Sequence, residues 1–263
     1  MDQSAPRSLR HEYELYVEEE IESYKDSISR TNLLKIGDEA VAVLLGQAQF
    51  AMNELLIWDE VDKIIRKRKR IPTYATWRKK QLRRLKELEE LRRPERWGLR
   101  PDSVIAREIH PPAESRVLVA GADSGNAVLY LAAHGCVVTA VNTHSEAVDS
   151  VLHAAEAAHL PGSIDGHATD IRNWLPPEAQ LFSAVVCTPT AFAGLTAAER
   201  TKVIEVLQTA TGDGGVHLVE TIIAGHSGVS VAELRRRYKG WEVSVMMEDG
   251  SSAKSFLARK AVA

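Results

Sequence analysis

Residues 117–132 read VLVAGADSGNAVLYLA, and this stretch decides the fold of the second half of the chain. The aliphatic run 117–120 has the composition of a buried strand, and Gly121 and Gly125 follow it. Apolar residues then recur at helical spacing, so the stretch predicts a strand, a glycine turn and a helix. Glycines let such a turn approach a ligand closely, and the amides at the start of the helix favour an anion.

Short aliphatic runs alternate with helical segments from about residue 115 to the C-terminus. This alternation predicts an α/β fold with a mostly parallel, Rossmann-like sheet of seven strands and helices on both faces. The last two strands are joined by EDGSSAK, which is too short for a helix, so one terminal strand must run antiparallel. We expect strands at about 116–121, 136–142, 164–168, 182–188, 214–221, 241–248 and 254–260, and helices at about 126–134, 145–158, 196–210 and 230–238.

This order of elements resembles the class I S-adenosylmethionine (SAM)-dependent methyltransferase fold over residues 115–263. VLVAGADSGNAVLYLA is similar to the family's first motif, VLDLGCGxGxxxxxLA, and VVTAVNTHSEAVD to its second strand and helix. GHATDIRNW, AVVCTPTAF and TGDGGVHLVE resemble the third, fourth and fifth strands with their turns. The resemblance implies that SAM, if it binds, is contacted by Gly121, Asp123, Gly125, Asn142 and Asp170.

Several positions depart from the family's cofactor motifs. Val119 stands where the family has a carboxylate that orients the methionine end of SAM, and Asn142 where an acidic residue accepts both ribose hydroxyls. Asp123 replaces a glycine, and if it faced the cofactor's carboxylate at ~4 Å, the repulsion would be ~4 kcal/mol at an effective dielectric of ~20. Asp170 either contacts adenine, as in the family, or caps a helix.

No residue is identified as catalytic. CTPT at 187–190 lacks the N-P-P-[YFW] sequence with which amino-group methyltransferases hold a planar nitrogen. His217 and His226 are candidate bases for O-methylation, although isolated histidines are more often buried or solvated without a catalytic role. The histidines and the two cysteines, Cys136 and Cys187, show no metal-ligand spacing, and the cysteines lie among aliphatic residues as buried thiols.

Residues 1–100 show helical periodicity and little glycine, which predicts an all-α N-terminal domain, and we expect a linker at 101–114. Tyrosines and tryptophans in this half serve either as core anchors or as an interface. The candidate core positions of the third helix are Phe50, Leu55, Trp58, Val61 and Ile65. The expected helices are 11–29, a second from a cap at 29 or 31 to about 45, a third at about 49–69, and a fourth at about 74–92.

Charge is distributed unevenly along the chain, although the net charge is only −3. Residues 1–62 carry −9, residues 63–110 carry +11, and the remainder carries −5. The basic segment 63–93 predicts an anionic partner, namely an acidic protein face, a membrane surface or nucleic acid, unless it pairs with the acidic block of the same domain. The isoelectric point near 6.3 argues against a dedicated nucleic-acid binder.

Two hypotheses from different classes follow. The first is a non-catalytic methyltransferase-like accessory subunit that needs no cofactor and docks through its helical arm onto a larger protein complex. The alternative is an active SAM-dependent methyltransferase that acts on a small molecule. The helical half is also similar to arms of bacterial accessory proteins, one of them a subunit of a photosynthetic reaction centre–light-harvesting complex. The absence of a signal core predicts a cytoplasmic location, peripheral on a membrane if such a complex is the partner.

Overall fold

The computed structural model describes residues 8–46, 54–121, 125–177, 180–221, 229–247 and 254–262. The chain divides into two compact units, residues 1–86 and 87–263. Within the described ranges, no helix combines the length and the apolar content that crossing a membrane requires.

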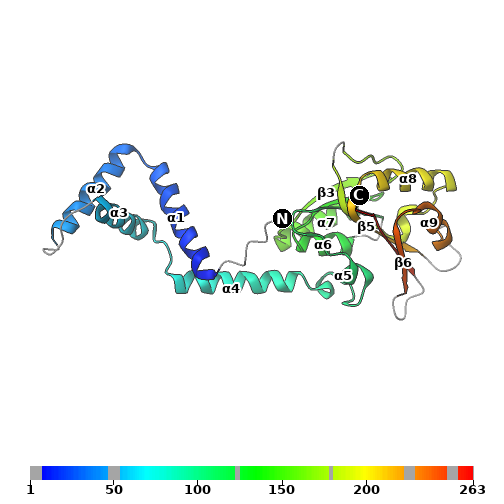
Figure 1. Cartoon of the computed structure of the whole chain (residues 1–263), viewed down its shortest axis with the longest axis horizontal. Coiled ribbons are helices and arrows are strands. Elements are labelled where there is room, and N and C mark those ends of the chain that lie inside the picture. Colours follow the sequence, from blue (N-terminus) through cyan, green and yellow to red (C-terminus); the bar gives the residue numbers. More distant parts are fainter. Residues whose placement is uncertain are drawn as a thin grey trace. The chain divides into compact units, whose positions relative to one another are not determined.

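The first unit is helical, as the periodicity predicts (Figure 1). The Ser8 and Ser29 hydroxyls accept hydrogen bonds from the backbone amides of His11 and Asn32, so serine caps begin the first two helices. The core is small and consists of Val17, Ile21, Ile36, Ala40, Val61, Ile64 and Ile65. The helices are α1 (Leu9–Ser27), α2 (Arg30–Leu45), α3 (Glu54–Lys69) and α4 (Tyr74–Leu91), the last of which continues into the second unit.

Two of the core positions expected in α3 are wrong. Leu55 is 79% exposed and Trp58 is 47% exposed, because the face of α3 that packs against α1 and α2 is the one that carries Val61 and the isoleucines after it. The predicted core positions Val61 and Ile65 are buried and are confirmed. Phe50 lies outside the described residues. Four other aromatic side chains form a ring cluster, in which Trp77 is buried and its ring centroid lies 5.5 to 6.5 Å from those of Tyr13, Tyr16 and Tyr74.

The second unit is built on a seven-stranded sheet in the order β3-β2-β1-β4-β5-β7-β6. The first five strands are parallel, and β7 alone runs antiparallel, inserted between β5 and β6. The predicted antiparallel terminal strand is therefore confirmed. The strands are β1 (Arg116–Ala120), β2 (Val137–Asn142), β3 (Ser163–Ala168), β4 (Phe182–Cys187), β5 (Thr211–Thr221), β6 (Glu242–Met247) and β7 (Lys254–Arg259).

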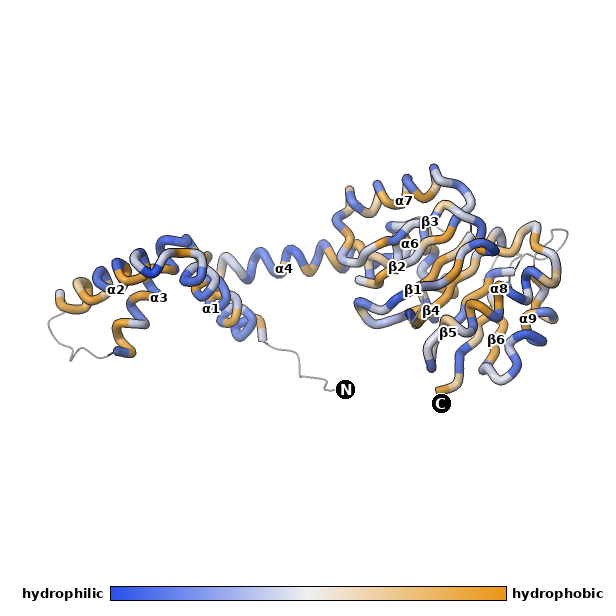
Figure 2. The backbone as a smooth tube through the Cα atoms, turned by 90° about the horizontal axis from the view of Figure 1, so that it is seen from above, coloured by the Kyte–Doolittle hydropathy of each residue, from blue (hydrophilic) through white to orange (hydrophobic). Residues whose placement is uncertain are grey.

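Helices cover both faces of the sheet (Figure 1). Val117 and Val119 pack toward α6, while Leu118 and Ala120 pack toward α8 and α9. The central strands are mostly hydrophobic along their whole length (Figure 2), as expected for parallel strands buried on both sides. The helices are α6 (Gly125–Ala133), α7 (Ser145–Ala158), α8 (Ala197–Thr209) and α9 (Val231–Arg237).

The segment expected to be a linker, 101–114, differs from that expectation. It contains the short helix α5 (Val104–Glu108), which Ser103 caps by accepting from the amide of Ala106 at 3.4 Å. Val104, Ile105 and Ile109 are buried in the same apolar cluster as β1 and α6. The prolines on both sides of this segment are typical of a linker, which is why the sequence predicted one. Its aliphatic residues nevertheless pack into the core of the α/β unit.

Candidate functional site

The carboxyl ends of β1 and β4 meet at Gly121. Its backbone amide donates to the Val141 carbonyl at 3.0 Å, and its φ is +120°. A Cβ atom at this position would lie 1.9 Å from the Thr188 hydroxyl oxygen and 2.8 Å from that of Thr190. The turn therefore requires glycine because of both its backbone angle and the threonines that lie against it.

Thr188 and Thr190 form a hydroxyl pair over the end of β1. Their oxygens lie 3.0 Å apart, and Thr188 also lies within hydrogen-bond distance of the Ala120 carbonyl through both its hydroxyl (3.3 Å) and its amide (3.0 Å). Both threonines flank the start of the 3-10 helix η2 (Pro189–Phe192). The sequence analysis gave Thr188 and Thr190 no role. The pattern that could have indicated one is a threonine on each side of a proline directly after a strand.

Two other positions of the first motif, Gly125 and Val119, differ in what they retain of it. Gly125 begins α6, as the motif predicts, and a Cβ there would lie 3.1 Å from a methyl group of Val151. Val119 is fully buried among apolar residues and so presents no polar group to a ligand. Asp123 lies outside the described residues.

Asn142 ends β2 at the same edge of the sheet and is buried. Its side-chain oxygen accepts a hydrogen bond from the backbone amide of His144 at 2.9 Å. This contact is an Asx-type turn that leads from β2 into α7, so the amide side chain serves the local backbone at the position where the resemblance places a ribose contact.

Asp170 follows β3 and is bound by Arg172 on both carboxylate oxygens. Oδ1 accepts from the Arg172 backbone amide at 2.8 Å and from Nε at 3.1 Å, while Oδ2 accepts from Nη2 at 2.8 Å. These hydrogen bonds from the guanidinium hold the pKa of Asp170 below its usual value. The backbone contact is that of a capping residue on the turn at 170–173, and the guanidinium continues to Glu199 at 3.3 Å.

His217 lies in the middle of β5 and is fully buried. Its Nε2 lies 2.6 Å from the Thr211 hydroxyl and its Nδ1 lies 2.7 Å from the Tyr238 hydroxyl. Burial, with a smaller contribution from the charge of Lys260, lowers the pKa of His217 to about 3. The interpretation as a buried strand histidine is confirmed, and His226 lies outside the described residues.

The two cysteines are buried thiols, as the sequence predicts. Cys136 and Cys187 are free and buried, and burial raises the pKa of the Cys136 thiol to about 11. Over the part of the chain that the structure describes, no three histidine, cysteine or acidic side chains are grouped closely enough to hold a metal ion.

The strand order, the single antiparallel strand and the glycine turn after β1 define a class I SAM-dependent methyltransferase-like fold. The chain is similar to TehB from Haemophilus influenzae, with 22% identity and a TM-score of 0.50 over 62% of each chain, so it spans less than two thirds of TehB. It is also similar to the N-methyltransferase NodS from Bradyrhizobium japonicum WM9, with 16% identity and a TM-score of 0.47 over 66% of this chain and 96% of NodS.

A third similar structure is magnesium protoporphyrin IX methyltransferase (ChlM) from Synechocystis PCC 6803 with bound SAM. Its identity is 15% and its TM-score 0.47, over 57% of this chain and 71% of that chain. Scans against protein-family models and against curated protein sequences find no match. At these identities the likeness shows the fold alone.

The described residues differ from the SAM contacts that the resemblance implies. Buried Val119 stands at the position of the first motif's carboxylate, and Asn142 at the position of the acidic residue at the end of β2. The Asn142 side-chain oxygen is hydrogen-bonded to the backbone. The one carboxylate retained, Asp170, is paired with Arg172. The turn at Gly121 keeps its backbone form, but the side chains around it satisfy one another.

Proposed function

We propose that the protein is a non-catalytic accessory subunit with a methyltransferase-like fold, which acts without SAM. The observation that carries this proposal is the state of the three positions Val119, Asn142 and Asp170, which are apolar, bonded to the backbone and ion-paired, respectively. A fold maintained without its ligand groups is expected of a domain that is used as a scaffold.

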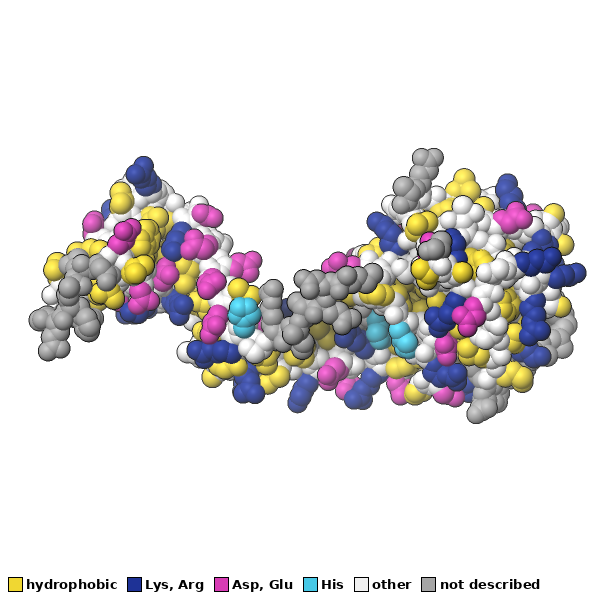
Figure 3. Space-filling model, in the orientation of Figure 1, with side chains coloured by type: hydrophobic (Ala, Val, Ile, Leu, Met, Phe, Trp, Pro, Cys, Tyr) yellow, Lys and Arg dark blue, Asp and Glu magenta, His cyan; other side chains and the backbone are white. Residues whose placement is uncertain are grey.

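Exposed apolar side chains of the helical unit support docking onto a larger complex. Those on α2 and α3 are Leu34, Val43, Leu45, Leu55 and Trp58, and Leu15 on α1 and Leu82 and Leu85 on α4 are exposed as well. Figure 3 shows hydrophobic side chains gathered over α2 and α3. An apolar surface of this kind on a unit with a small core is typical of a protein contact.

The basic segment 63–93 contributes charge to the same proposal. Part of it pairs within the unit, because Arg68 contacts Glu39 and Lys69 contacts Glu20. The remaining cations favour a partner with an acidic surface, or an anionic membrane surface beside it, over nucleic acid. The exposed cations of this segment that have no ion pair within the described ranges are Arg66, Lys67, Arg70, Arg78, Lys79, Lys80, Arg84, Lys86 and Arg92. The resemblance of the helical half makes a membrane-bound photosynthetic complex the partner that we propose.

Calorimetric titration of the full chain with SAM tests the absence of cofactor binding. We expect no binding up to millimolar SAM, because the groups that would hold the amino-acid end, the ribose and the adenine are missing at Val119 and engaged at Asn142 and Asp170. The variant Asp123→Gly/Asn142→Asp is the matched comparison, and binding that appears only in this variant would identify the altered side chains as the cause.

The alternative function is an active SAM-dependent methyltransferase for a small molecule, which the retained turn at Gly121 and Gly125 favours. A micromolar dissociation constant for SAM in the unaltered protein would contradict the scaffold proposal and support this alternative. Methyl transfer from labelled SAM to a small molecule would then establish it.

A further inference from the structure

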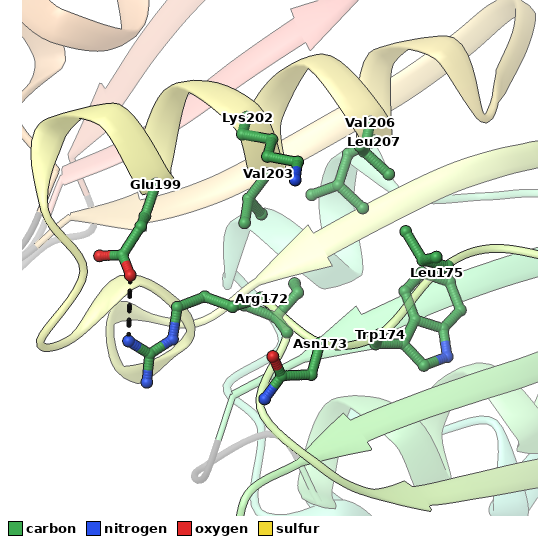
Figure 4. Close-up of a pocket in the computed structure, with 10 residues that line it drawn as sticks. Arg172, Asn173, Trp174, Leu175, Glu199, Lys202, Val203, Val206 and Leu207 are labelled. Atoms are coloured by element: carbon green, nitrogen blue, oxygen red, sulfur yellow. Dashed lines mark hydrogen bonds and ion pairs between the residues drawn. The ribbon is translucent and has the colours of Figure 1, made fainter.

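A crevice of about 410 Å³ lies between α8 and residues 171–175 (Figure 4). Its floor is apolar and is formed by the buried side chains of Ile171, Trp174, Val203 and Leu207. Leu175, which is 71% exposed, forms part of its rim. Gly121, Gly125 and Asn142 do not line it, so it is separate from the turn at Gly121, although Arg172, which pairs with Asp170, lies at one end of it.

The crevice arises from the connection between β3 and β4. Parallel strands are usually joined by a helix that covers the sheet, but the described residues of this connection form a turn and an extended segment. The Trp174 indole covers the sheet in place of a helix, with its ring centroid 6.1 Å from that of Phe182 and 6.2 Å from that of His167. A single indole is narrower than a helix, so apolar space remains beside α8.

The charged side chains at one end of the crevice form ion pairs, whereas the lysine further along it does not. Arg172 lies between Asp170 and Glu199, so these charges compensate one another. Lys202, one turn further along α8, lines the crevice and has no ion-pair partner within the described ranges. In Figure 4 its amino group extends along the crevice above the apolar side chains.

We propose that this crevice binds a small amphipathic carboxylate, whose apolar body lies against Trp174 and whose anionic group pairs with Lys202. The volume falls in the range of about 300–1,000 Å³ that is usual for small-molecule sites, and an apolar lining with one directed polar group is their common composition. A second crevice of about 520 Å³ shares Leu175, Lys202 and Val206 with the first, which gives room for a longer alkyl chain.

Calorimetric titration of the full chain with decanoate and with decyltrimethylammonium tests the proposal. Decanoate is expected to bind at one site, and the cation of the same chain length to bind at least tenfold more weakly, because only the anion pairs with Lys202. Lys202→Met, which keeps the apolar stem, should weaken decanoate binding by about 10- to 100-fold.

Two further variants separate this site from general surface effects. Lys239→Met removes an exposed lysine after α9, outside the crevice, and should leave decanoate binding unchanged. Leu175→Glu places a negative charge on the exposed rim and should weaken it by about tenfold without affecting the fold. The proposal is overturned if decanoate does not bind at millimolar concentration, if the cationic probe binds equally well, or if Lys202→Met binds like the unaltered protein. None of these outcomes depends on whether SAM binds.

Discussion

Gly121 shows how one residue fixes the geometry at the end of two strands. Thr188 bonds back to the Ala120 carbonyl, and its hydroxyl occupies the space that any side chain at position 121 would need. The ends of β1 and β4 are therefore joined through a contact that tolerates only a hydrogen atom. This contact concerns folding, whether or not the turn holds a ligand.

Gly121→Ala should lower the free energy of unfolding by about 3 kcal/mol, since it combines an unfavourable backbone angle with a clash. Gly194→Ala is the matched control, because Gly194 also has a positive φ, of +73°, but open space around its Cβ position. That variant should lose only about 1 kcal/mol. Urea denaturation measures both, and equal losses would show that the threonine contact has no effect.

Buried His217 makes stability depend on pH. The native side chain stays neutral because burial lowers its pKa to about 3, whereas the unfolded chain has the ordinary value near 6.5. Below that value the unfolded state binds a proton that the native state does not, so stability falls as the pH is lowered toward 3.

The loss attributable to His217 is about 2 kcal/mol between pH 7.5 and pH 5. Urea denaturation at several pH values should show a shallower dependence in His217→Gln than in the unaltered protein. His153→Gln, which changes an exposed histidine, should retain the steeper profile. Parallel profiles for His217→Gln and the unaltered protein would contradict a neutral buried imidazole.

At the scale of elements, Glu199 at the start of α8 takes part in both a local helix cap and a contact with a distant segment. Thr196 and Glu199 form a capping box, in which Glu199 accepts from the Thr196 amide at 2.7 Å and Thr196 accepts from the Glu199 amide at 3.3 Å. The same carboxylate also receives Arg172 from the β3–β4 connection. The start of α8 is therefore fixed both by its own sequence and by a distant segment.

Thr196→Ala should destabilise the protein by about 1 kcal/mol, because it leaves an amide at the start of α8 without its acceptor. Thr201→Ala makes the same chemical change inside the same helix, where the hydroxyl only bonds back to the Ala197 carbonyl, and it should be close to neutral. Thermal denaturation of the two variants compares them directly. A larger loss in Thr201→Ala would show that the cap is not the stronger contact.

At the scale of the whole molecule, the chain combines a unit with a large core and a helical unit whose core is small. The acidic and basic blocks of the helical unit pair in part, through Arg68 and Lys69 with glutamates of α2 and α1. The cations left over and the exposed apolar residues of α2 and α3 are the features that we assign to docking.

Reversing the charges of Arg66, Lys67 and Arg70 to glutamate should abolish docking onto the proposed partner complex. The helical content should stay unchanged, because these cations have no ion pair in the described structure. Arg235, Arg236 and Lys239 reversed in the same way form the control, with an equal change of charge on the α/β unit. Co-sedimentation with membranes of the native cells and circular dichroism measure the two effects. Retention of the first variant on the complex would count against this segment as the docking surface.

The sequence by itself determined the fold class, the seven strands and the helices between them. Their hydrophobic periodicity is local, and most of the strands need only their own aliphatic run to be predicted. The sequence also predicted the turn after β1 from Gly121. The φ angle of this residue is one that few residues other than glycine adopt. The segment 101–114 was misjudged, since its prolines are a local signal while the burial of Val104 and Ile105 is not.

Only the tertiary structure decided how the side chains at the carboxyl edge are used. Whether Asn142 and Asp170 face a ligand or bond to their neighbours depends on which groups lie within hydrogen-bond reach, and that varies over fractions of an ångström. The hydrophobic periodicity also could not predict the crevice beside α8 or the exposure of Leu55 and Trp58. Burial depends on which neighbouring element covers a face. Periodicity specifies which face of an element is apolar, and packing specifies what, if anything, covers it.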